Sequence, residues 1–283
     1  MTYKVVKAPP DSCSPPPIDA AVAAAWLTAF LRDELRERRR IDRAVLGLSG
    51  GVDSAVTAYL CARALGPKNV HALRMPYRTS STASLDDAQL VIDALGIESS
   101  TIEISDAVDG YLRTEPQADA RRRGNVMARI RMVVLFDQSA KLGALPVGTG
   151  NKTERLLGYY TWHGDDAPPV NPLGDLFKTQ VWELARYLGV PQRLIEKAPT
   201  ADLEADQTDE RDLGITYARA DAILSRMLLG YSGEQLAERG FAAQEVDLVR
   251  RRVDGTHWKR HLPTTAMLSE TAINEFYLRP VDY

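Results

Sequence analysis

A glycine- and serine-rich loop, SGGVDS at residues 49–54, constrains the fold of this chain more than any other segment. It follows the apolar run AVLGLS (44–49), which predicts a buried strand, and it leads into DSAVTAYLCARALG (53–66), which predicts a helix. A strand, a tight glycine-rich turn and a helix in this order are typical of an α/β domain. In such domains, ligands bind at the carboxyl ends of the strands.

The residues of this loop indicate a phosphate ligand. Gly50 and Gly51 leave backbone N–H groups open at the start of a helix, and such groups bind phosphate oxygens. Ser49 and Ser54 add hydroxyl donors, whereas the Asp53 carboxylate tolerates a phosphate only with a divalent cation between them. The Gly-Lys-Ser/Thr of a Walker A loop is absent, which disfavours transfer of a γ-phosphoryl group. A glycine-rich turn that binds nothing is the structural alternative.

Strand-like and helix-like segments alternate beyond the loop. Ser84 and Asp87 are spaced like a capping box at the start of one predicted helix. We therefore predict an α/β fold, a doubly wound parallel sheet with flanking helices, whose ligand-binding edge carries the glycine-rich segments 47–51 and 148–150. The patterns predict further strands at 70–75, 100–105 and 144–150, and helices at 84–96, about 125–142 and 178–190.

The sequence predicts an N-terminal arm and one domain. Residues 1–17 are rich in proline and serine and predict a flexible arm, and residues 18–283 are assigned to a single domain with a helical C-terminal part. Apolar residues at helical spacing predict a helix over 18–40. The acidic segment 202–212 is interpreted as a solvated loop. The basic segment 249–263 is interpreted either as a solvated helix face or as a site for an anionic dinucleotide.

Charge and cysteine usage disfavour several classes of function. The chain has 35 basic and 38 acidic residues and a formal net charge of −3, so nucleic-acid binding is not expected. No apolar run of about 18 residues is present, so no membrane association is expected. Cys13 and Cys61 are too few for a disulfide framework, which favours a cytoplasmic location. Sulfur transfer is also disfavoured, because Cys13 lies in the arm and Cys61 in a helix.

The SGGxDS pattern after an apolar strand resembles the phosphate loop of the ATP pyrophosphatase superfamily, which has an adenine nucleotide alpha-hydrolase-like fold. Three further segments resemble NAD synthetase, in the expected order. With the phosphate loop and MPYRTSSTASLDDA (75–88), the resemblance covers about residues 20–265. The three segments are GNVMARIRMVVLFDQSAKLGALPVGTGNKTERLLGYYT (124–161), NPLGDLFKTQVWELARYLGVP (171–191) and APTADLEADQTDERDLGI (198–215).

This resemblance implies an AMP-forming carbon–nitrogen ligase of NAD biosynthesis. The implied reaction adenylates the carboxylate of deamido-NAD with ATP, then displaces AMP with ammonia, giving NAD, AMP and pyrophosphate. Mg²⁺ is the implied cofactor. About 45 residues precede the phosphate loop, too few for a glutaminase domain, so free ammonia or a separate ammonia donor is expected. A homodimer is also implied, and Trp26 and Phe30 of the 18–40 helix belong either to that interface or to the core.

The resemblance also implies roles for individual residues. Asp53 and Glu154 would bind Mg²⁺, and with Lys178 they form the implied catalytic group. Two metal-holding carboxylates and a lysine suit a reaction in which a carboxylate attacks a triphosphate, because both reactants are anions. The implied ATP-binding residues are Gly47, Leu48, Ser49, Gly50, Gly51, Val52, Asp53, Ser54, Arg74, Thr149, Lys178 and Thr200.

Four residues are assigned to deamido-NAD. The resemblance places Arg129, Trp258 and Lys259 on this substrate. Tyr159 is assigned either to stacking on the nicotinate ring or to the core. The loop around 158–170 is positioned to close the site against water.

One stretch departs from the family. Where the family often shows TKYGDGGADINP, this chain reads TWHGDDAPPVNP (161–172), so a lysine and an aspartate are replaced by Trp162 and Pro169. Asp165 and Asp166 are candidates to replace the lost carboxylate, with a solvated loop as the alternative. His163 is the histidine we single out for a functional role.

Two other functions remain open at this point. The altered 161–170 loop permits a related ATP-dependent amide ligase acting on a different carboxylate. A non-catalytic nucleotide-binding protein is the second alternative. Asp53, Glu154 and Lys178 argue against it, because binding without turnover does not need two metal-holding carboxylates.

Overall fold

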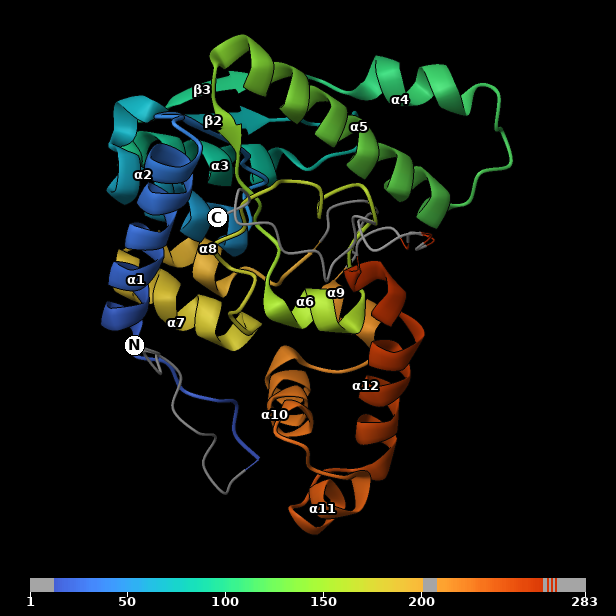
Figure 1. The fold of residues 1–283 in the computed structure, drawn as a ribbon. Helices are drawn as coiled ribbons and strands as arrows, with labels where there is room; N and C mark the ends of the chain where they lie inside the picture. The colour runs from blue at the N-terminus through green and yellow to red at the C-terminus, as the bar shows by residue number, and fades with distance from the viewer. Residues whose placement is uncertain (1–12, 201–207, 262–263, 265, 267, 269–283) are drawn as a thin grey trace.

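The computed structural model describes residues 13–200, 208–261, 264, 266 and 268. Its centre is a parallel four-stranded sheet with the order β3-β2-β1-β4 (Figure 1). The strands are β1 (Ala44–Gly47), β2 (Val70–Arg74), β3 (Glu98–Thr101) and β4 (Leu145–Pro146). Beyond β4, a single bridge pairs Val147 with Val170. The parallel sheet confirms the predicted α/β class.

Alternate residues of β1 face two separate apolar layers. Ala44 and Leu46 pack into one core, whereas Val45 packs into the core on the opposite face of the sheet. Both faces are therefore covered, as the unbroken apolar run of this strand predicts. The first layer contains α1 (Ala20–Arg32), α2 (Val52–Leu65), α3 (Thr82–Leu95), α7 (Lys178–Leu188) and α8 (Gln192–Glu196), and the second contains α4 (Ser105–Leu112) and α5 (Ala120–Leu142) (Figure 1).

A helical cluster beside the sheet has its own core, centred on the fully buried Tyr217. Trp182 of α7 packs against both this core and the sheet-side core, and its ring lies edge-on to Tyr217 at 5.9 Å. The cluster and the α/β layers thus meet at α7. Its members are α6 (Lys152–Leu157), α9 (Asp209–Leu213), α10 (Tyr217–Leu228), α11 (Gly233–Glu238), α12 (Ala243–Gly255) and the 3₁₀ turn η3 (His257–Arg260) (Figure 1).

The start of α3 differs from the prediction. Ser81, not Ser84, caps this helix, and its Oγ accepts a hydrogen bond from the Ser84 backbone N–H at 3.1 Å. Asp87 takes no part in capping: it is buried, and its carboxylate pairs with Lys197 at 2.8 Å. The N-cap therefore lies three residues earlier than predicted, because two serines lie within one turn.

Other element boundaries also differ from the predicted ones. The helix predicted from 125 begins at Ala120, because the Asp119 side chain accepts a hydrogen bond from the Arg122 N–H at 2.7 Å. The predicted 18–40 helix ends as α1 at Arg32 and continues as a π-helical turn, η1 (Asp33–Arg38). Strand β3 spans Glu98–Thr101 rather than 100–105, since its partner β2 ends at Arg74, opposite Thr101.

Residues 13–17 of the predicted arm contact the body of the protein. Cys13 Sγ donates a hydrogen bond to the Arg239 carbonyl at 2.9 Å. Gln180 Nε2 donates to the Pro16 carbonyl at 3.3 Å, and Arg226 Nη1 donates to the Ser14 carbonyl at 3.2 Å. Residues 1–12 of the arm, 202–207 of the acidic segment, and 262–263 of the basic segment lie outside the described residues. Within the part of the chain that is described, no helix is long and apolar enough to cross a bilayer.

Candidate active site

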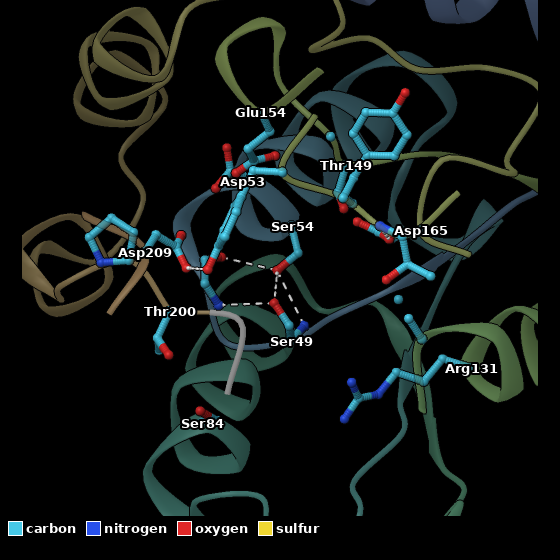
Figure 2. Close-up of a pocket in the computed structure, with 18 of the residues that line it drawn as sticks. Ser49, Asp53, Ser54, Ser84, Arg131, Thr149, Glu154, Asp165, Thr200 and Asp209 are labelled. Atoms are coloured by element: carbon cyan, nitrogen blue, oxygen red, sulfur yellow. Dashed lines mark hydrogen bonds between the residues drawn. The ribbon is translucent and has the colours of Figure 1, made fainter. Parts of the chain in front are cut away.

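The phosphate loop lies at the carboxyl end of β1 and is folded by its own serines (Figure 2). Ser54 Oγ accepts from the Ser49 N–H at 3.2 Å and donates to the Gly51 carbonyl at 3.0 Å, while the Gly51 N–H donates to Ser49 Oγ at 3.3 Å. Gly51 is then the residue before α2, which begins at Val52. The serines therefore hold the loop in a turn that opens directly onto a helix N-terminus.

Gly50 allows this turn to lie against α3. Its φ of +78° is in the left-handed region that favours glycine. A Cβ added at Gly50 would lie 2.2 Å from the backbone oxygen of Ser84. Both observations require glycine at this position.

Asp53, Glu154 and Lys178 come together from three helices. Lys178 Nζ forms a hydrogen-bonded ion pair with Asp53 Oδ2 and lies 3.6 Å from Glu154 Oε1. Asn151 Nδ2 donates to Asp53 Oδ1 at 2.9 Å, and the Asn151 side chain also caps α6. Because each of the three charged residues lies in the first turn of its helix (α2, α6 or α7), the three helix N-termini converge on one point.

The three charges perturb one another's protonation. Burial and, after it, the nearby Asp53 carboxylate raise the pKa of Glu154 to about 8 against the opposing effect of Lys178. Burial alone would lower the pKa of Lys178, whose side chain is 3% exposed, but the Asp53 and Glu154 carboxylates raise it above its ordinary value. Lys178 therefore stays an ammonium between Asp53 and Glu154.

Asp209 and two tyrosines extend this group, and the sequence did not single out Asp209 or Tyr217. Tyr217 donates a hydrogen bond to Asp209 Oδ2 at 3.0 Å, and its ring lies under Lys178 Nζ, 5.2 Å from the ring centroid. Asp209 is buried at the start of α9, so residues 209–212 of the acidic segment form a helix and not the solvated loop that we expected. The acidic residues next to it in the sequence hid this buried one.

Tyr159 takes a polar role within the same group. Its hydroxyl donates to Asp212 at 2.9 Å and to Asp209 at 3.2 Å, and its ring packs beside the helical core. Burial and these two carboxylates raise the pKa of Tyr159 above its ordinary value, so the phenol stays protonated. Tyr159 also lines the cavity described next.

A cavity of about 810 Å³ joins the phosphate loop to these charges. Figure 2 shows Thr149, Asp165 and Arg131 lining it, with Ser84 and Thr200 also at its wall. Of the predicted ATP-binding residues, the cavity is lined by Gly47, Leu48, Ser49, Gly51, Val52, Asp53, Ser54, Arg74, Thr149, Lys178 and Thr200. Such a volume is within the range of pockets that enclose nucleotide-sized ligands.

Of the residues assigned to deamido-NAD, two line the cavity and two lie outside its lining. Lys259 and Tyr159 line the cavity, and Lys259 Nζ donates to the carbonyls of Gly158 at 2.9 Å and Tyr160 at 3.0 Å. Arg129 and Trp258 do not line it. Arg129 donates to the Trp162 carbonyl at 3.1 Å, and the Trp258 ring lies edge-on to the Trp162 ring at 5.1 Å.

The family-divergent loop contributes one carboxylate to the cavity. Asp165 lines it and accepts a hydrogen bond from the Thr161 N–H at 2.8 Å, whereas Asp166 is not among the lining residues. His163 is exposed, has a φ of +57°, and stacks obliquely on Trp162 at 4.0 Å. The chain thus places Asp165, rather than Asp166 or His163, at the cavity wall.

Lys197 is a further cation that the sequence did not single out. It lines the cavity beside the phosphate loop, and its Nζ donates to Asp87 Oδ2 at 2.8 Å and to Ser84 Oγ at 3.2 Å. Lys197 lies three residues before Thr200 in the KAPTADL segment. Its closeness in sequence to a predicted ATP-binding residue is the one sequence feature that could have identified it.

The donor set suits Mg²⁺ only in combination with a substrate. In the described ranges 13–200 and 208–261, no three Asp, Glu, His or Cys side chains form a group able to hold a metal by themselves. Asp53 and Glu154 supply carboxylate oxygens on one side of the cavity. Mg²⁺ is commonly held by one or two carboxylates together with substrate phosphates and water, so this donor set fits it.

Comparison with known proteins agrees with the family resemblance seen in the sequence. The family model described as NAD synthase matches residues 23–263. An NH₃-dependent NAD⁺ synthetase of Trichlorobacter lovleyi is 48% identical over 258 residues, covering 91% of this chain and 94% of that protein.

Two solved structures share the fold closely. An NMN synthetase from Francisella tularensis superposes with a TM-score of 0.79 and 32% identity, covering 88% of this chain and 99% of that one. An NH₃-dependent NAD synthetase from Campylobacter jejuni, in complex with nitrate, has a TM-score of 0.76 and 31% identity, covering 88% and 100% of the two chains.

Proposed function

Because the chain belongs to the NAD synthase family, we propose that it catalyses the ATP-dependent amidation of deamido-NAD to NAD with ammonia, releasing AMP and pyrophosphate. The observation that carries this proposal is the position of Lys178 between Asp53 and Glu154, at the wall of the cavity that the phosphate loop opens into. In this proposal, the Lys178 ammonium would contact the triphosphate, and the carboxylates would hold a divalent ion bound to it.

The first step needs the two anionic reactants to meet. A nicotinate carboxylate oxygen attacks the α-phosphorus of ATP, the bond to the β-phosphate oxygen breaks, and pyrophosphate leaves. The N–H groups at the start of α2 and the Lys178 ammonium are the groups that would balance the charge on the leaving pyrophosphate. Mg²⁺, held by Asp53 and Glu154, would supply additional positive charge there.

The second step consumes the acyl-adenylate. Ammonia attacks the carbonyl carbon, AMP leaves, and one proton must be removed from the new amide nitrogen. Asp165 is our candidate to accept that proton, because it lines the cavity together with Tyr160 and Lys259. Exclusion of water during this step would depend on the 158–166 segment, which Lys259 holds through two backbone carbonyls.

Ammonia is the nitrogen source that we propose, as in the NH₃-dependent name of the Trichlorobacter lovleyi relative. Supply by a separate donor protein is the alternative to free ammonia. The cytoplasmic location suggested by cysteine usage stays a prediction.

We also propose that the protein is a homodimer formed through α5. Val133 and Phe136, on successive turns of this helix, are 64% and 42% exposed. Apolar side chains of this size on adjacent turns favour burial against a partner. The 18–40 helix is a weaker candidate because Leu31 and Leu35 point into the core, although Trp26 is exposed. Phe136→Glu should convert the dimer to a monomer in light scattering, and Trp26→Glu should leave it a dimer.

A second candidate function is amidation of a mononucleotide carboxylate. The Francisella tularensis structure is named an NMN synthetase, and Arg129 and Trp258 of this chain lie outside the cavity that would hold the reacting carboxylate. Competition between deamido-NAD and nicotinic acid mononucleotide, compared as kcat/KM, decides between the two substrates.

Pyrophosphate release from Mg-ATP with deamido-NAD and ammonium tests the proposed reaction. We expect turnover with ammonium, much less with glutamine at equal concentration, and none in Asp53→Asn. The matched control is Asp86→Asn, because Asp86 is an exposed aspartate on α3 outside the cavity. Absence of turnover with either nitrogen source, or full activity of Asp53→Asn, would contradict the proposal.

A further inference from the structure

A buried carboxylate of the helical cluster reaches across to two other helices. Asp221 of α10 is 0% exposed. Its Oδ1 accepts a hydrogen bond from Thr153 Oγ1 at 2.5 Å, and its Oδ2 accepts from the Thr179 backbone N–H at 2.9 Å and from Thr179 Oγ1 at 2.8 Å. Both carboxylate oxygens are thus used, one on α6 and the other on α7.

The two threonines are sequence neighbours of the candidate catalytic residues. Thr153 precedes Glu154, and Thr179 follows Lys178. The Lys178 backbone N–H also donates to Thr153 Oγ1 at 2.9 Å. Through Thr153, therefore, the first turns of α6 and α7 are joined to each other as well as to Asp221.

Asp221 does for α7 what a capping residue would otherwise do. The residue before α7 is Phe177, whose side chain has no acceptor, so the N–H groups of the first turn need a partner from elsewhere. Asp221 accepts one of them from a helix 42 residues away in sequence. A carboxylate near a helix N-terminus is also favoured by the helix dipole.

We propose that Asp221 is a positioning residue for the reaction, fixing Glu154 and Lys178 relative to each other by holding the first turns of α6 and α7. The inference rests on the proposed function for what those two residues do.

Kinetics and stability together distinguish positioning from general stabilisation. In Asp221→Asn we expect kcat to fall about 10- to 100-fold, as for a misplacement of catalytic groups by about 1 Å, with the KM for deamido-NAD within about twofold of wild type. Thr153→Val should reproduce the loss because it removes the shared hydroxyl, and Thr153→Ser should recover most of it.

The matched control is Leu224→Ala on the same helix. Leu224 is buried in the helical core, and its aliphatic side chain cannot hydrogen-bond to Thr153 or Thr179. We expect this variant to lower the melting temperature at least as much as Asp221→Asn and to keep kcat near wild type at 25 °C. Equal kcat losses in the two variants, or a wild-type kcat in Asp221→Asn, would overturn the inference.

Hydrogen exchange tests the same inference without any substrate. Amide exchange of peptides covering 152–157 and 178–183 should speed up about tenfold or more in Asp221→Asn, and that of α11 should not change. Unchanged exchange at both helix starts would refute the positioning role. If wild type shows no turnover with any carboxylate, the proposed function fails, and this exchange experiment still decides whether Asp221 holds the two helices.

Discussion

Replacing Gly50 by alanine should damage both the fold and ATP binding, for two reasons that can be worked from its surroundings. The φ of +78° costs an alanine about 1–2 kcal/mol relative to glycine. The new Cβ would lie 2.2 Å from the Ser84 carbonyl oxygen, which is backbone and cannot rotate away, so the loop and α3 must separate by about 1 Å. Overpacking of this kind costs about 1–3 kcal/mol.

The two costs together amount to about 3 kcal/mol, which corresponds to a fall in melting temperature of about 6–12 °C for a chain of this size. Because the loop that moves is the one whose N–H groups would hold the phosphates, kcat/KM for ATP should fall about 100-fold. Thermal unfolding followed by circular dichroism, and pyrophosphate release at varied ATP, measure the two effects.

Gly51→Ala is the matched control for stability. Gly51 has a φ of −96°, which any residue adopts, and an added Cβ would meet only the Ser49 hydroxyl at 3.4 Å. Its melting temperature should therefore stay within about 2 °C of wild type. If Gly50→Ala had the same melting temperature as Gly51→Ala and bound ATP as wild type does, the argument from backbone geometry would be refuted.

Three further outcomes follow from other parts of the structure. Lys178→Met should lower kcat for pyrophosphate release about 100- to 1000-fold, because it removes the ammonium between Asp53 and Glu154; a loss under tenfold would contradict its catalytic role. Burial raises the pKa of the Cys61 thiol to about 12, so a thiol reagent at pH 8 should label Cys13 in the native protein and Cys61 only after denaturation, as mass spectrometry of the two peptides would report. Hydrogen bonds from Arg219 lower the pKa of Glu245 below its ordinary value of 4.5, so this pair stabilises the fold above about pH 4.5 and the benefit is lost as the pH falls through the lowered pKa. Denaturant unfolding of Arg219→Met should accordingly differ from wild type by up to about 1 kcal/mol at pH 7 and by less at pH 3, and a difference that grows on acidification would be inconsistent with this sign.

Local sequence patterns were enough to predict the class of fold and the position of the phosphate loop. Residues 44–66 contain a complete strand, turn and helix, and each part depends only on neighbours in the chain. The same holds for α7, whose apolar stripe gives its start at Lys178 directly. Boundaries were less certain where two capping residues compete within one turn, as Ser81 and Ser84 do.

The buried polar group around Lys178 could not be predicted in the same way. Asp209, Tyr217 and Asp221 belong to helices that reach the site only after the helical cluster has packed, and nothing within a few residues of each marks it as buried. Asp209 lies in an acidic segment whose composition is typical of a solvent-exposed loop. A carboxylate is identified as internal only by the partners that the tertiary fold brings to it.

The contacts of residues 13–17 have a consequence for how the chain is made. Cys13 and its partner Arg239 are 226 residues apart in sequence. A ribosome adding about 5–20 residues per second needs about 10–45 s to pass from one to the other. For that interval the early segment has no helical cluster to bind, while the strands and helices of the sheet, whose partners are nearer, are already complete. Completion of the cluster is therefore governed by closure of a very long loop rather than by helix formation, and it is the step most exposed to interruption of synthesis.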